Sequence, residues 1–196
     1  MSGFGYALFP PLGDQLVDIS RDRAASRHPG SVTVADVRLE LLADRPDLIE
    51  PVGQLRWNEW GRPPEHDELA WWIAATAREA GRAGLPVTYA AVTGDNILVG
   101  AAGIGEFDIP ERRDRSPWVL GLVVRPGCRA AGIGRLLLRQ LEHHAADLGY
   151  PNLWVANEGP AVEFYTRCGY QEAETVVIAN GAAAHIMARR LLASRA

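Results

Sequence analysis

The stretch Val124-Arg125-Pro126-Gly127-Cys128-Arg129-Ala130-Ala131-Gly132-Ile133-Gly134 joins two segments whose structure can be predicted from their pattern. Residues 118–124, which lead into it, are almost continuously apolar, as is typical of a strand buried on both faces. The residues after it are apolar at helical spacing and predict one buried face of a helix of about four turns, namely Ile133, Leu137, Leu141, Ala145 and Leu148. The stretch is therefore the loop of a strand-loop-helix junction.

This junction has the properties of an anion site. The first turn of a helix has backbone N–H groups without partners and carries about half a positive charge. Gly132 and Gly134 allow a phosphate to approach the backbone closely, and Arg129 and Arg135 add positive charge beside it. We therefore expect the loop to bind a pyrophosphate.

The pentapeptide Ala-Ala-Gly-Ile-Gly of this loop also occurs at residues 101–105, which provides an internal comparison. There it is followed by Glu106-Phe107-Asp108-Ile109-Pro110, which repels phosphate and cannot start a helix. We interpret the earlier copy as glycines in a strand or a bulge. Other glycine-loop families fit less well, because the chain contains no lysine for a phosphate loop of NTPases and has Leu137 where a dinucleotide-binding fold would need a third glycine.

The quoted stretch resembles the acetyl-CoA motif of the GNAT N-acetyltransferases, Val-x-Pro-x-x-Arg-Gly-x-Gly-x-Gly/Ala, with Ala130 in place of the usual glycine. That departure should be tolerated provided that the backbone angles of Ala130 are not of the glycine-only kind. Further along, Ala161-Val162-Glu163-Phe164-Tyr165-Thr166-Arg167-Cys168-Gly169-Tyr170 is similar to the family's Ala-x-x-x-Tyr-x-x-x-Gly-Phe/Tyr segment. The two matches occur in the family's order, and the resemblance covers roughly residues 32–192.

The resemblance implies an α/β (α+β) GNAT fold, with a central mixed, mostly antiparallel sheet of about six or seven strands flanked by about four helices. The patterns along the chain agree with the order β, α, α, three strands, α, β, α, β, β. We expect residues 31–196 to form a single domain and residues 1–30 to be an N-terminal extension. The first strand is expected to begin near Val32 and to end near Asp44, and the closing strands are expected at residues 175–178 and 184–188.

The activity implied by the resemblance is transfer of an acetyl group from acetyl-CoA, the acyl-donor substrate, to a primary amine of a small molecule or peptide. The amine would attack directly in a ternary complex. Tyr165 is the residue that we expect to protonate the departing thiolate. The thiol formed has a pKa near ~8.5 and a phenol near ~10, close enough for a positioned tyrosine to share or donate its proton. The backbone N–H of Leu122 or Val123 would bind the thioester oxygen, since this strand is typically bulged in the family and Gly121 would ease a bulge.

Two acidic residues, Glu106 and Asp108, are candidate bases for the amine, directly or through water. By resemblance, the donor site comprises Leu122, Val123, Val124, Arg129, Ala130, Ala131, Gly132, Ile133, Gly134, Arg135, Asn157 and Tyr165.

The first two helices usually form one wall of the acceptor pocket in this family, and there we expect Trp57, Glu59, Trp60 and His66 to contact the acceptor. We assign Trp72 to the core by its helical spacing, and His143 and His144 to the solvated surface.

Composition narrows the partners. The net charge is -4 with a pI near 5.7, and no arginine cluster could neutralise a row of phosphates, so nucleic acid is not an expected partner. Neither a membrane span nor a signal peptide is predicted, and we expect a cytoplasmic protein. The two cysteines and five histidines show no metal-ligand spacing, so no metal is expected. The acidic balance favours a cationic acceptor.

Two alternatives stay open. A catalytically degenerate relative could bind CoA or acyl-CoA as a sensing or interaction module, although Tyr165 and the pair Gly132 and Gly134 argue against it. Dimerisation is common in proteins of this type, and a homodimer is not demonstrated by any residue here. The apolar stretch at residues 4–9 is the segment that would dock on the body or on a partner chain.

Overall fold

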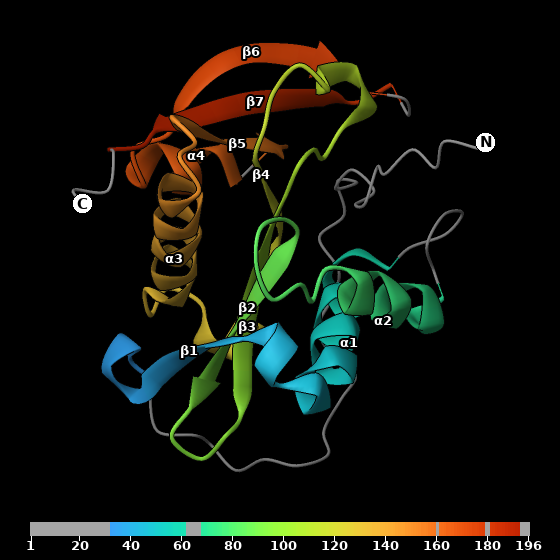
Figure 1. Ribbon diagram of the computed structural model, residues 1–196, viewed down its shortest axis with the longest axis vertical. Coiled ribbons are helices and arrows are strands. Elements are labelled where there is room, and N and C mark those ends of the chain that lie inside the picture. The colour runs from blue at the N-terminus through green and yellow to red at the C-terminus, as the bar shows by residue number, and fades with distance from the viewer. Residues whose placement is uncertain (1–31, 62–67, 160, 179–180, 193–196) are drawn as a thin grey trace.

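A seven-stranded sheet organises the protein, with the strand order β1-β2-β3-β4-β5-β7-β6 (Figure 1). The computed structural model describes residues 32–61, 68–159, 161–178 and 181–192. The strands are β1 (Val37–Leu41), β2 (Val87–Thr93), β3 (Leu98–Gly105), β4 (Trp118–Val124), β5 (Asn152–Asn157), β6 (Gln171–Val177) and β7 (Ala183–Arg190). The helices are α1 (Ile49–Trp60), α2 (Leu69–Arg78), α3 (Ile133–Asp147) and α4 (Ala161–Arg167). The predicted fold class and element order are confirmed.

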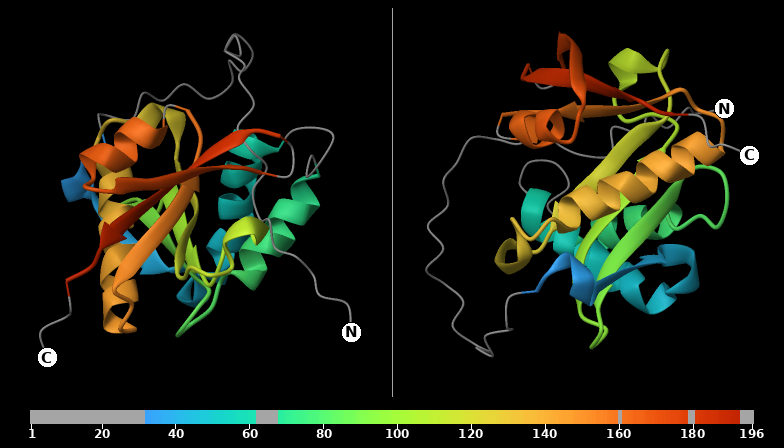
Figure 2. Two further views of the ribbon diagram at one scale, coloured as in Figure 1. Left: turned by 90° about the horizontal axis from the view of Figure 1, so that it is seen from above. Right: turned by 90° about the vertical axis from the view of Figure 1, so that its left-hand side faces the viewer.

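The helices cover both faces of the sheet. Figure 1 and Figure 2 show α3 on one side of β2 and β3, and α1 and α2 on the other. The alternation of side chains along β2 agrees, because Val87 and Ala91 pack in the cluster that contains α3, whereas Ala90 and Val92 pack with α1. Both strands are consequently apolar on both faces, and the earlier Ala-Ala-Gly-Ile-Gly copy lies within β3, as expected.

Three boundaries differ from the sequence prediction. β1 begins at Val37 rather than near Val32, because Val34–Asp36 form a 3-10 turn in which the N–H and hydroxyl of Thr33 both donate to Asp36 Oδ2, at 3.0 and 2.8 Å. β6 begins at Gln171, before the predicted start. It is an edge strand with mostly exposed side chains, so its first residues give no apolar alternation. β7 runs on to Arg190.

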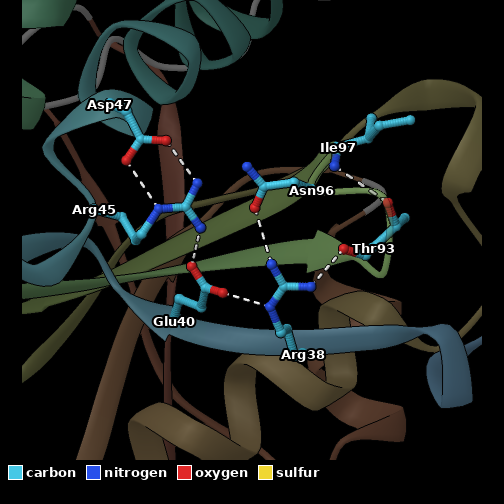
Figure 3. A network of polar contacts seen from close by, with 7 residues as sticks. All are labelled: Arg38, Glu40, Arg45, Asp47, Thr93, Asn96 and Ile97. Carbon is cyan, nitrogen blue, oxygen red and sulfur yellow. Dashed lines mark hydrogen bonds and ion pairs between the residues drawn. The ribbon is translucent and has the colours of Figure 1, made fainter.

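A polar network attaches the edge strand β1 to the turn between β2 and β3 (Figure 3). The guanidinium of Arg38 donates to the carbonyl of Thr93 at 2.8 Å and to Asn96 Oδ1 at 2.9 Å. Glu40 lies between Arg38 and Arg45 and accepts from both. The turn between β2 and β3 is tight, with Asn96 at a φ of 65°. These contacts fix the end of the sheet that lies farthest from β6.

The site depends on how β4 and β5 meet. They are the only parallel neighbours in the described sheet, and they share one register pair, Trp118 with Trp154. The N–H of Trp154 also donates to the carbonyl of Pro117 at 3.0 Å. Beyond this point the two strands have no further paired residues, so the sheet opens between them.

Candidate active site

A cleft of about 670 Å³ occupies the opening between β4 and β5. Its walls come from both strands, from the glycine loop and the start of α3, and from α4. Fourteen of the predicted site residues line it: Glu59, Trp60, Asp108, Leu122, Val123, Val124, Arg129, Ala130, Gly132, Ile133, Gly134, Arg135, Asn157 and Tyr165. The structure therefore brings most of the predicted donor site into one cavity.

Four predicted residues lie elsewhere. Ala131 packs against the core cluster that contains α3 instead of facing the cleft. Trp57 and Glu106 are not among the residues that line the cleft, and Glu106 is exposed and borders a second, smaller pocket. His66 lies outside the described residues.

The glycine loop presents the positive end of α3 to the cleft. Gly132 is the N-cap residue and has a φ of 84°, a left-handed conformation that favours glycine. Its carbonyl accepts the first intrahelical hydrogen bond, from Leu136 N–H at 3.0 Å. The N–H groups of the first helical turn have no partner within the helix, and this turn contains no acidic residue. The geometry therefore fits a bound phosphate group.

Ala130, the departure from the family motif, has a φ of 63°. This left-handed region costs a residue with a Cβ atom about 1–2 kcal/mol but is accessible to it, unlike the conformations that only glycine adopts. Ala130 lines the cleft, so the loop still borders the site with alanine at this position, at a cost in backbone strain.

Arg129 connects the glycine loop to the predicted acceptor wall. Its Nε donates to the carbonyl of Val124 at 3.1 Å, and its Nη2 donates to Glu59 Oε2 at 2.6 Å. Glu59 and Trp60 lie at the end of α1 and line the same cleft. Sequence analysis placed Arg129 and Glu59 in separate sites, and the structure joins them as an ion pair.

β4 contains the predicted bulge. Ala101 of β3 pairs with Val123, and Gly103 pairs with Leu120, so Gly121 and Leu122 together face the single residue Ala102. Gly121 has a φ of 50°, as in bulges that begin with a left-handed glycine. Such a bulge interrupts the ladder and leaves an unpaired backbone group, here at the wall of the cleft.

Tyr165 is a buried residue of α4 whose ring packs edge-on against Tyr170, with ring centroids 5.5 Å apart. Burial raises the pKa of the Tyr165 hydroxyl well above its usual value, and the negative charge of Asp108 raises it further. The phenol therefore keeps its proton at neutral pH and can act only as a proton donor or hydrogen-bonding group there.

Asp108 is only 8% exposed and lines the cleft. Burial raises the pKa of its carboxyl group to about 7, with a further contribution from the negative charge of Glu79. A base with a pKa near neutrality is well matched to proton transfer at neutral pH. Between the two acidic candidates, the structure brings Asp108 and not Glu106 to the cleft.

Sequence analysis missed the charged pair behind Asp108. Arg56 of α1 and Glu79, directly after α2, are almost completely buried and form an ion pair in which Nη1 and Oε2 are 2.7 Å apart. Arg56 Nη1 also donates to Thr76 Oγ1 at 3.2 Å. The available signal was the position of Arg56 on the apolar face of α1, next to Leu55, because a buried charge requires an opposite charge nearby.

Asn157 is the last residue of β5, and one polar atom of its side chain has no hydrogen-bond partner among the described residues. Its Nδ2 donates to the carbonyl of His185 at 3.4 Å, whereas its buried Oδ1 accepts no hydrogen bond from the described residues. Because Asn157 lines the cleft, this oxygen can accept a hydrogen bond from an amide N–H of a bound molecule. A pantetheine chain carries such groups, so the residues present fit CoA.

His144 is not a purely solvated residue. It is half-buried, its Nδ1 lies 3.1 Å from the hydroxyl of Tyr89, and its Nε2 lies 3.0 Å from the carbonyl of Gly84. The predicted core position of Trp72 is confirmed, because its side chain is only 1% exposed.

Within the described ranges no helix is long and apolar enough to cross a membrane, and no cluster of three or more potential metal ligands occurs.

Solved structures of other proteins share this fold. An aminoglycoside 6'-acetyltransferase type Ii has a TM-score of 0.61 at 22% identity, covering 81% of this chain and 99% of its own. A dodecameric spermidine N-acetyltransferase from Vibrio cholerae has a TM-score of 0.58 at 16% identity, covering 80% and 94%. At these identities the likeness shows the fold. No curated protein matches the sequence.

The sequence profile described as "Acetyltransferase (GNAT) family" matches residues 45–170, which include the bulged strand, the glycine loop, α3 and α4. The profile thus spans most of the chain and the walls of the cleft. The chain belongs to the GNAT family of acetyltransferases.

Proposed function

We propose that this acetyltransferase transfers the acetyl group of acetyl-CoA to a primary amine of a small molecule or peptide, with both substrates bound at once. The observation that carries the proposal is the convergence on one cleft of the open N-terminus of α3, the β4 bulge, buried Tyr165 and buried Asp108. These groups match the requirements of donor binding, oxyanion stabilisation and proton transfer.

The donor would lie along the opening between β4 and β5. The first-turn amides of α3, with Arg129 and Arg135, would hold the diphosphate. The free Oδ1 of Asn157 would accept an amide N–H of the pantetheine chain. Of the two predicted donors, Leu122 lies in the bulge, whereas Val123 pairs with Ala101. The N–H of Leu122 would therefore donate to the thioester oxygen, on which negative charge develops during attack.

Proton transfer would involve two residues. Acetyl-CoA supplies an activated thioester carbonyl and a thiolate leaving group. The carboxylate of Asp108 would take a proton from the acceptor amine, directly or through water, and the hydroxyl of Tyr165 would donate its proton to the departing sulfur. Tyr165 recovers a proton from solvent after release. Glu106 is the weaker candidate base because it faces the other pocket.

A cationic acceptor is the best supported class. The cleft is lined by Asp108 and Glu59 together with the indole of Trp60, and carboxylates and aromatic faces both attract ammonium groups. Two structural neighbours are an aminoglycoside 6'-acetyltransferase and a spermidine N-acetyltransferase, both of which are named for cationic amines.

The test is release of free thiol from acetyl-CoA in the presence of a panel of amines that includes spermidine, an aminoglycoside and a short peptide. We expect amine-dependent release for at least one of them. The Tyr165→Phe variant should lower turnover about 10²- to 10⁴-fold, the usual effect of a general acid, with little change in CoA affinity.

Two results would contradict this proposal. Tight CoA binding with hydrolysis-level release for every amine would favour a CoA-binding module without catalysis. Full turnover by the Tyr165→Phe variant would mean that another group protonates the thiolate.

A further inference from the structure

Glu59 occupies a position that does not favour its own helix. It lies in the last turn of α1, where the helix dipole is negative, and no basic side chain in that turn compensates for it. Its carboxylate instead accepts from Arg129 Nη2 at 2.6 Å, on the glycine loop of the donor site. Both residues line the cleft, so the stabilising partner of Glu59 is also a proposed ligand of the diphosphate.

The ion pair between Glu59 and Arg129 is weak enough for another anion to replace Glu59 as the partner of Arg129. The side chains are 31% and 49% exposed, and a partly exposed pair of this kind is weak because water screens both charges. A diphosphate carries more negative charge than one carboxylate and can accept two parallel hydrogen bonds from a guanidinium. It would also receive hydrogen bonds from the first-turn amides of α3, so it would compete effectively with Glu59 for Arg129.

We propose that donor binding releases the carboxylate of Glu59 from Arg129, and that this carboxylate then pairs with the ammonium group of the acceptor. Glu59 is thereby a specificity-determining residue for cationic amines. Once the diphosphate engages Arg129, the carboxylate of Glu59 is left as a charged group beside Trp60, within the cleft. A cationic amine can neutralise it, whereas a neutral acceptor cannot. This inference rests on the proposed function, because it assigns the diphosphate to Arg129.

The exchange has a thermodynamic consequence. Glu59 opposes donor binding while it holds Arg129, and it favours acceptor binding once it is released. Donor binding therefore strengthens binding of a cationic acceptor, and by linkage the acceptor strengthens donor binding by the same factor. If Glu59 served only to hold Arg129 in place, its removal would weaken donor binding.

The deciding experiment measures the Kd of CoA by calorimetry. Glu59→Gln should tighten CoA binding about two- to fivefold, the range set by a partly exposed ion pair. Arg129→Gln should weaken it, and in that background Glu59→Gln should have no further effect. Glu50→Gln is the matched control, since Glu50 is an exposed acid on the same helix. It should leave the Kd unchanged.

The acceptor half is measured with the amine that gives the fastest thiol release. Glu59→Gln should raise its KM about two- to fivefold at saturating acetyl-CoA, with kcat unchanged, because the carboxylate binds the cation and takes no part in proton transfer. The same amine should bind more tightly to the wild-type protein with CoA present than without it, and Glu59→Gln should abolish this difference.

Several outcomes would overturn the inference without touching the proposed function. These are weaker CoA binding in Glu59→Gln, equal tightening in the Arg129→Gln background or in Glu50→Gln, and an unchanged KM for the amine. Absence of CoA binding by the wild-type protein, or of turnover with every amine, would instead refute the proposed function.

Discussion

Replacing Asp108 with asparagine should make the protein more stable at neutral and alkaline pH, although the residue lies at the centre of the site. The change removes the titrating group and nearly preserves the side-chain volume. In the folded protein the pKa of the Asp108 carboxyl is about 7, compared with an ordinary value of 3.8. The difference of about 3 pKa units corresponds to about 4 kcal/mol.

The unfolding free energy should fall with rising pH because the pKa of Asp108 is raised in the folded state. Because the pKa is raised in the folded state, the folded protein binds this proton more tightly than the unfolded chain does. Below about pH 4 both states are protonated and Asp108 contributes no pH-dependent penalty. As the pH rises from about 4 to about 7, Asp108 ionises in the unfolded state but keeps its proton in the folded state. The unfolding free energy of the wild type therefore falls by about 4 kcal/mol across this interval, and that of Asp108→Asn does not fall for this reason.

The assay is urea unfolding, followed by tryptophan fluorescence, at a series of pH values from about 4 to about 8. The measured quantity is the difference in unfolding free energy between Asp108→Asn and wild type, which cancels most other titrations. Asp95→Asn, the same substitution at an exposed position in the β2–β3 turn, is the control. A difference that is constant across the series for Asp108→Asn would refute the reasoning.

The same variant tests the proposed chemistry. The wild-type kcat/KM should rise with pH and level off above an apparent pKa of about 7, because Asp108 must be ionised to accept a proton. Asp108→Asn should be slower and should lack this limb. A retained limb with full activity would assign the base to another residue.

Three further changes probe the loop and the buried pair. Gly132→Glu should abolish CoA binding in calorimetry, because it places bulk and negative charge at the N-terminus of α3 and forces a side chain onto a φ of 84°; wild-type affinity would show that the diphosphate lies elsewhere. Ala130→Gly should raise the unfolding free energy by up to about 1 kcal/mol in urea titrations, since relief of left-handed strain exceeds the entropy cost of glycine, and a loss would contradict the strain. Glu79→Gln should destabilise the fold by about 3–5 kcal/mol, because it leaves the buried charge of Arg56 without its carboxylate partner. It should also lower the pKa of Asp108, and an unchanged pH dependence of kcat/KM would disprove the interaction between Glu79 and Asp108.

Some features of the site could be predicted because they depend on local backbone geometry. The loop before α3 was identified from its glycines and from the change of pattern at Gly132, since the start of a helix and its free amides are local properties. The bulge in β4 was implied by the family resemblance, and Gly121, whose φ of 50° suits glycine, permits it. The different roles of the two Ala-Ala-Gly-Ile-Gly copies followed from the residues after each, which either continue as a helix or do not.

Other features could not be predicted because they depend on distances between remote segments. Glu106 and Asp108 are two positions apart and equivalent in sequence, yet one borders the smaller pocket and the other is buried in the cleft. Only the packing of α2 places Glu79 where its charge raises the pKa of Asp108. No local pattern relates Glu59 to Arg129, seventy positions further along the chain.

The amino-acid sequence by itself determined the order of helices and strands, the glycine loop before α3 and the family, because periodic burial and glycine conformations are encoded within a few neighbouring residues. The tertiary structure alone decided which acid enters the cleft and with what pKa, and which charges form pairs. Those properties arise from burial and from Coulomb interactions over a few ångströms, and the folded chain sets such distances between segments that the sequence keeps far apart.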